Sequence, residues 1–182
     1  MIRSVLLGFL IALFAAGLMA AVATPAKRID PRAFALRIVS ATATQGSICS
    51  ATAVGPDEIE TAAHCLSYPL RLANDKPATL VRAYKVTEDR VRAKIAGVRF
   101  DAWATPGKAV QGQRVRFWGQ PHGRPFVYRE GAVVAVYPDG LLLDVTVCSG
   151  DSGSGVFDDA GRLVGVVSFM TDDKGCTFAG AR

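Results

Sequence analysis

The sequence has few of the residues that would build a metal centre. It holds only two histidines, His64 and His122, and none of its four cysteines is spaced as C-x-x-C. Structural zinc sites are usually built from such pairs, so this class of site has little support. We expect no metal and no cofactor in this protein.

Other absences limit the architecture. No internal repeat or low-complexity tract is present, and no apolar run beyond the N-terminal one is long enough to span a membrane. The 182 residues suit one domain, or two small subdomains that share a core. With 50% hydrophobic and 20% charged residues, the chain has the composition of a globular protein.

The N-terminal segment has the pattern of a secretory signal peptide. Arg3 is the only early charge, an apolar run begins at Val5, and Ala21-Val22-Ala23 forms a small-residue cleavage site. We expect cleavage after residues 1–23, and a linker at 24–33. An uncleaved anchor is the alternative, since the apolar run is about as long as the shortest membrane-spanning helices. Either way, the rest of the chain is predicted to be secreted or periplasmic.

All four cysteines lie in the part of the chain that is predicted to be exported: Cys49, Cys65, Cys148 and Cys176. An oxidising compartment permits disulfides, so two bridges are expected, and three pairings are open. A bridge closing the loop from Cys49 to Cys65 would stabilise the protein by about 3 kcal/mol.

The body of the chain is predicted to be β structure. Short β-branched or alternating runs are separated by Gly, Pro, Asp and Asn turn signals, without helical periodicity. Such a pattern is typical of an all-β sandwich or barrel. The seven runs are ALRIVSATA, ATLVRAYKV, VRAKIAGVRF, QRVRFWG, EGAVVAVY, GLLLDVTV and RLVGVVSF.

Two short segments carry the candidate chemistry. In ETAAHCLS, His64 precedes Cys65, and an imidazole is the natural general base near neutral pH. In CSGDSGSGVF, Ser152 lies between Gly150 and Gly153, where glycine lets backbone N–H groups approach an oxyanion. The hydrolase signature G-x-S-x-G is excluded, because Ser154 stands where the last glycine is needed.

These motifs resemble those of a known family. TAAHC and GDSGSG are similar to the histidine and serine motifs of the trypsin-like, chymotrypsin-fold serine endopeptidases. The resemblance covers roughly Ala35 to Ala181, and GQRVRFWGQPHG and LVGVVSF also resemble family segments. It implies a protease domain at 34–182, formed by a double β-barrel with the active site between the barrels. It also implies disulfides between Cys49 and Cys65 and between Cys148 and Cys176.

The resemblance implies a mechanism as well. Ser152 would attack a peptide carbonyl and form an acyl-enzyme, and His64 would act as general base. The N–H groups of Gly150 and Ser152 would form the oxyanion hole. The triad acid is expected to be Asp101, because it ends a predicted strand and precedes Ala-x-Ala, similar to the family's D-x-A-L segment. The alternatives are Asp75, Asp89 and Asp144.

The substrate pocket is expected to accept a small or medium uncharged side chain. By the resemblance, Thr146 falls at the pocket floor, where an aspartate would select Lys or Arg. Ser168 and Met170 fall on the pocket wall, and the Met170 side chain would narrow it. Substrates would be proteins or peptides, and we expect a monomer.

Activation by chain cleavage is not expected. Arg37-Ile38-Val39-Ser40 superficially resembles the cleavage point of digestive relatives, whose freed terminus pairs with the aspartate before the nucleophile. Only ten residues separate Ile38 from Cys49, however, so the run is predicted to be a strand. The partner of Asp151 stays open.

The charge pattern suggests no further ligand. The net charge is +5, and basic residues are concentrated between Arg82 and Arg129, where they alternate with apolar ones as on a solvated strand face. We therefore expect no nucleic-acid partner, and we expect His122 to be a turn residue. Two other functions stay open: a catalytically silent protease fold that binds a partner, and a membrane-anchored envelope protease.

Overall fold

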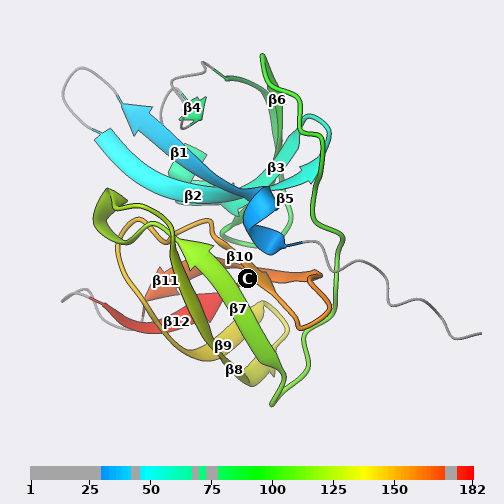
Figure 1. Cartoon of the computed structure of the whole chain (residues 1–182), viewed down its shortest axis with the longest axis vertical. Helices are drawn as coiled ribbons and strands as arrows, with labels where there is room; N and C mark the ends of the chain where they lie inside the picture. The colour runs from blue at the N-terminus through cyan, green and yellow to red at the C-terminus, as the bar shows by residue number, and fades with distance from the viewer. Residues whose placement is uncertain (1–29, 42–45, 67–69, 73–77, 171–175) are drawn as a thin grey trace, which may run out of the picture.

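The protein folds as two β units joined by one extended segment. The computed structural model describes residues 30–41, 46–66, 70–72, 78–170 and 176–182. One unit holds β1 to β6 and the other holds β7 to β12 (Figure 1). The predicted signal peptide, residues 1–23, lies outside the described residues. Within the described ranges, no helix has both the length and the apolar character needed to cross a bilayer.

The N-terminal unit is a six-stranded sheet with the order β4-β1-β2-β3-β6-β5. Its strands pair antiparallel, and two short 3-10 helices accompany them. The elements are η1 (Pro31–Phe34), β1 (Ala35–Ala41), β2 (Gly46–Gly55), β3 (Glu58–Ala62), η2 (Ala63–Leu66), β4 (Leu70–Leu72), β5 (Thr79–Lys85) and β6 (Arg90–Ala96).

The C-terminal unit is a closed barrel with the order β10-β11-β12-β9-β8-β7. Its strands also pair antiparallel. The elements are β7 (Arg114–Gly119), η3 (Pro121–Gly123), β8 (Val127–Tyr137), β9 (Gly140–Val147), β10 (Gly155–Phe157), β11 (Leu163–Met170) and β12 (Thr177–Ala181).

The segment between β6 and β7 runs down one side of the molecule and is bonded to both units (Figure 1). The Ala104 N–H donates to the carbonyl of Ala53 in β2, and the Gly107 N–H donates to that of Leu163 in β11. Phe34 and Phe157, one from each unit, add a ring contact at 6.2 Å nearby. The connection is therefore part of the packing between the units.

Each unit has its own apolar core, which follows the alternation of its strands. In β9, the residues at 141, 143, 145 and 147 are buried in the barrel, whereas Asp144 and Thr146 point outward. The N-terminal core is built from smaller side chains around Ile38, Ile59 and Ile95. This alternation is what a pleated strand with one buried face requires.

The all-β fold predicted from the sequence is confirmed. Each of the seven predicted runs overlaps a strand, in chain order β1, β5, β6, β7, β8, β9 and β11. The run Arg37–Ser40 lies within β1, as predicted. The strands β2 and β12, rich in Ala, Gly and Ser, were not predicted, because small residues have little intrinsic strand preference and extend here by pairing with neighbours.

Both predicted disulfides are present. Cys49 is bonded to Cys65 within the N-terminal unit, and Cys148 is bonded to Cys176 within the barrel. The first bridge fixes η2 to β2, and the second fixes the residue before the predicted oxyanion loop to the start of β12.

Candidate active site

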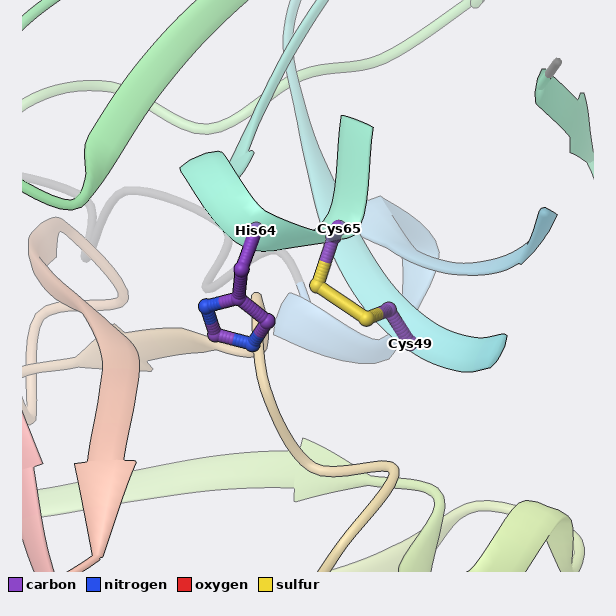
Figure 2. Close-up of side chains that lie close together, drawn as sticks. All are labelled: Cys49, His64 and Cys65. Atoms are coloured by element: carbon purple, nitrogen blue, oxygen red, sulfur yellow. A yellow bond between two sulfur atoms is a disulfide. The ribbon is translucent and has the colours of Figure 1, made fainter. Parts of the chain in front are cut away.

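His64 lies in η2, directly after β3. The disulfide from the neighbouring Cys65 to Cys49 ties this turn to β2, and Figure 2 shows the imidazole beside that bridge. The His64 side chain is 49% exposed, so its ring can meet a molecule from solvent.

Asp89, in the turn between β5 and β6, is the carboxylate that meets His64. Its oxygens lie 3.1 and 3.3 Å from His64 Nδ1, and Oδ1 also accepts the His64 backbone N–H at 3.3 Å. A carboxylate can only accept, so the ring proton must be on Nδ1. That tautomer leaves the lone pair on Nε2, as a general base requires.

Ser168 holds Asp89 from the other unit. Its hydroxyl donates to Asp89 Oδ2 at 2.5 Å, and its side chain is buried at the end of β11. Ser168 was expected on the wall of a substrate pocket. The bond to Asp89 does not test that placement, which stays a prediction.

Asp89, and not the expected Asp101, is thus the carboxylate that the structure brings to His64. β6 ends at Ala96, so Asp101 does not end a strand, and its exposed side chain lies on a bend of the connecting segment. Asp89 was discounted because it lies in a charged turn. The pairing of Ala62 in β3 with Arg90 in β6 brings that turn beside His64, and this register was the signal that the sequence analysis missed.

The loop that carries Ser152 belongs to the barrel but is bonded to β2. The Ser50 N–H donates to the Ser152 carbonyl at 2.7 Å, and the Ser50 hydroxyl donates to the Gly150 carbonyl at 3.1 Å. Cys65 Sγ lies 3.8 Å from the same Ser152 oxygen. The Ser152 carbonyl thus lies beside the disulfide of Cys65, the residue that follows His64 in the chain.

Two glycines of this loop have a conformation that other residues rarely adopt. Gly150 and Gly153 have φ of +97° and +86°. A Cβ at Gly150 would overlap the Gln120 carbonyl, and one at Gly153 would overlap the Ser50 carbonyl. The loop can therefore have its shape only with glycine at both positions.

The N–H groups of Gly150 and Ser152 were predicted to form an oxyanion hole. In the described part of the chain, neither the Gly150 N–H nor the Ser152 N–H donates to another protein group. Two neighbouring N–H groups are used internally, since Asp151 donates to the Cys148 carbonyl and Ser154 to that of Asp151. The loop thus leaves free the donors that an oxyanion would need.

Asp151 has a partner inside the barrel. Its carboxylate is fully buried and accepts from Arg129 Nη1 at 2.5 Å and from the Cys148 N–H at 2.8 Å. Burial raises the pKa of Asp151, while the Cys148 N–H and Arg129 act in the opposite direction. Arg129, in β8, was not identified from the sequence. It supplies the cation that the sequence analysis left open.

The remaining predicted residues are placed on the barrel without forming a described pocket. Thr146 is exposed on β9, opposite Phe178 of β12, and Met170 ends β11 opposite Ala179. The structure does not describe the side chain of Met170. The predicted substrate preference therefore stays a prediction.

His122 lies in a turn, as predicted, with a left-handed φ of +52°. Its N–H donates to the Ser149 carbonyl at 2.6 Å, directly before Gly150. Its ring lies 3.8 Å from Cys176 Sγ, and that sulfur belongs to a disulfide, so it offers no thiolate to a metal.

Comparisons with known proteins agree with this geometry. A family model described as a trypsin-like peptidase domain matches residues 41–166. No curated protein sequence gives a significant match. The active form of the Rv3671c protease from M. tuberculosis has a TM-score of 0.70 at 21% identity, covering 83% of this chain and 76% of that one.

Two further solved structures are similar. A variant of the HtrA-type protease AlgW with a tripeptide has a TM-score of 0.70 at 20% identity, over 85% of this chain and 56% of that one. The serine endoprotease from Yersinia pestis gives 0.65 at 17%, over 84% of this chain and 59% of that one. At these identities the likeness shows a shared fold.

The Arg129 pair predicts a pH-dependent stability. In Arg129→Met, an ionised Asp151 stays buried without its cation, so the pKa of Asp151 should rise further. The native state then binds the proton more readily than the unfolded state, and the variant should lose stability as the pH rises through that raised pKa. Urea unfolding of variant and wild type between pH 4 and pH 8, about the range where a raised carboxyl pKa acts, measures this.

The matched control is Arg114→Met, which removes an arginine whose partner, Glu130, is exposed. This control should change the free energy of unfolding little at any pH. If Arg129→Met is no less stable at neutral than at acid pH, relative to wild type, then Asp151 does not depend on Arg129.

Proposed function

Because the chain belongs to the trypsin-like peptidase family, we propose that it is a serine endopeptidase with Ser152, His64 and Asp89 as its catalytic triad. The observation that carries this proposal is the contact of Asp89 with both His64 Nδ1 and the Ser168 hydroxyl. The bond from Ser168 fixes the orientation of the Asp89 carboxylate toward the His64 imidazole. A chance ion pair on the surface would not need this second hydrogen bond.

The reaction begins with the Ser152 hydroxyl, which attacks the carbonyl carbon of a peptide bond while His64 Nε2 takes its proton. Asp89 keeps the imidazole in the required tautomer and stabilises the imidazolium that forms. The C–N bond then breaks, His64 passes the proton to the leaving amine, and an acyl-enzyme remains on Ser152. Water hydrolyses this ester by the same proton transfers in the second half of the cycle.

The developing oxyanion is stabilised by the N–H groups of Gly150 and Ser152. Support for this role comes from the absence of other acceptors for these groups among the described residues. Asp151 shapes the loop through Arg129 and Cys148, so the donors need no freed chain terminus to be held in place. The enzyme is therefore active without cleavage near Ile38.

The protein acts outside the cytoplasm, after removal of its first 23 residues. The signal pattern supports this proposal, and the two disulfides suit an oxidising compartment. The intact mass of the exported protein should correspond to a chain that begins at Thr24. A mass that includes residues 1–23 would instead favour the membrane-anchored form.

The assignment of the acid can be tested against the rejected candidate. Exported wild type should react with a fluorophosphonate probe at Ser152, and Ser152→Ala should not. Asp89→Asn should lower kcat on a casein substrate by on the order of 10⁴, because asparagine favours the wrong imidazole tautomer. Asp101→Asn should leave kcat nearly unchanged, since its side chain is exposed away from the triad contacts.

Each outcome of this test decides something. Equal loss in the two aspartate variants, or loss in Asp101→Asn alone, would return the assignment to another carboxylate. A folded, disulfide-bonded wild type that never labels would favour the silent protease fold that binds a partner.

The substrate class is the finer part of the proposal. Cleavage follows a small or medium uncharged side chain, because Thr146 offers no negative charge where the family resemblance puts the pocket floor. Digestion of a peptide library, with sequencing of the new termini, should show such residues before the cut. A strong preference for Lys or Arg would contradict this. The variant Thr146→Asp should shift the preference toward those residues.

A further inference from the structure

Arg182, which follows β12, is bonded into the barrel through its backbone. Its N–H donates to the Val166 carbonyl at 3.0 Å, and its carbonyl accepts the Val166 N–H at 2.8 Å. The residue thus extends the pairing of β12 and β11 by one step, close to Ser168. Its side chain is only 19% exposed.

The contacts of Arg182 surround the pair formed by Asp89 and Ser168. Its Nη1 lies 2.7 Å from the Glu88 carboxylate, and its carbonyl accepts from Arg90 Nη1 at 3.4 Å. Glu88 and Arg90 are the two neighbours of Asp89 in the chain. The Arg182 guanidinium also lies over the ring of Phe169, at 5.3 Å, and Phe169 follows Ser168. Asp89 and Ser168 have four direct neighbours in the chain, and Arg182 contacts three of them.

The two sides of Asp89 are held unequally. On one side, Arg90 Nε donates to Glu60 at 2.7 Å, and Glu60 is fully buried in β3 with Arg92 as its second cation. On the other side, Glu88 is 72% exposed, and its bonding partner is Arg182. The Arg182 guanidinium holds the pKa of Glu88 below its usual value, so this carboxylate is ionised at neutral pH. The barrel residue Arg182 thus holds the Glu88 side of the turn, whereas the sheet residue Glu60 holds the Arg90 side.

From these contacts we infer that Arg182 is a positioning residue, which sets Asp89 between His64 and Ser168 by tying the turn between β5 and β6 to the barrel. This inference rests on the proposed peptidase function, in which Asp89 orients His64. Arg182 belongs to the C-terminal barrel and does not touch the triad directly. It acts through the residues next to Asp89 and Ser168 in the chain.

The physical reason is that Asp89 and Ser168 belong to different units, so any slip between the units lengthens their hydrogen bond. Arg182 moves with β11 and β12, and it bonds to the turn that carries Asp89. Its ion pair with exposed Glu88 adds little to global stability, as for other exposed pairs. Its effect should therefore appear in the reactivity of His64 and Ser152 and leave the unfolding midpoint nearly unchanged.

The test compares Arg182→Met with Glu88→Gln, which removes the same ion pair from an exposed position, and with Arg114→Met as the control. The labelling rate with a fluorophosphonate probe should fall about fivefold to tenfold in Arg182→Met and by about half as much, on a logarithmic scale, in Glu88→Gln. Arg182→Lys should recover part of the rate. Arg114→Met should label at the wild-type rate, because the Arg114 pair with Glu130 lies outside the triad contacts.

A second readout separates positioning from charge and does not need an active enzyme. Nuclear magnetic resonance follows the two imidazoles, with His122 as internal reference. The charged groups around the Asp89 turn are Lys85, Glu88, Arg90, Glu60, Arg92, Asp139 and Arg182. If Arg182 positions Asp89, the hydrogen bond from His64 Nδ1 to Asp89 should lengthen in Arg182→Met, and the chemical shift of the Nδ1 proton should move upfield. If Arg182 acted only as a nearby cation, this bond and its chemical shift should stay as in wild type.

An upfield shift of the His64 Nδ1 proton in both Arg182→Met and Glu88→Gln, with unchanged thermal midpoints, supports the inference. An unchanged or downfield shift of that proton, or a labelling rate equal to that of Arg114→Met, overturns it. If Arg182→Met fails to fold, the exposed Glu88→Gln carries the test alone. If wild type does not label at all, the proposed function fails, while the chemical shift of the His64 Nδ1 proton still decides the role of Arg182.

Discussion

The candidate site depends on the docking of one barrel loop onto one strand of the N-terminal sheet. Ser50 of β2 donates twice to this loop, to the carbonyls of Gly150 and Ser152. The close approach is allowed because Gly153 has no side chain to meet the Ser50 carbonyl. The proposed nucleophile comes from one unit and the proposed base from the other. Without this docking, neither unit holds a complete set of groups.

Buried charge gives the loop its shape. Asp151 is enclosed in the barrel, and a carboxylate there would be costly without the cation of Arg129 and the N–H of Cys148. We propose that this cation replaces the charge that chain cleavage delivers in digestive relatives. In this protein the strand that contains Ile38 is a structural element of the sheet, and the cation comes from β8.

The parts of the site that could be predicted from sequence are those with a local pattern. His64 precedes a cysteine, and Ser152 is surrounded by glycines, so residue type, spacing and the family resemblance that they carry predict both as site residues. The acid has no such pattern, and Asp89 meets His64 only through the register of β3 with β6. Arg129 and Arg182 escaped notice for a related reason. Charged residues in alternating strands look solvated until their partners, distant in the chain, are known.

Each disulfide closes a loop inside its own unit, Cys49 to Cys65 in the sheet and Cys148 to Cys176 in the barrel. Neither one crosslinks the two halves of the molecule. Among the described residues, the halves are joined covalently by the connecting segment alone, and the proposed triad straddles their boundary. Alignment of the proposed triad therefore depends on the non-covalent contacts between the two halves.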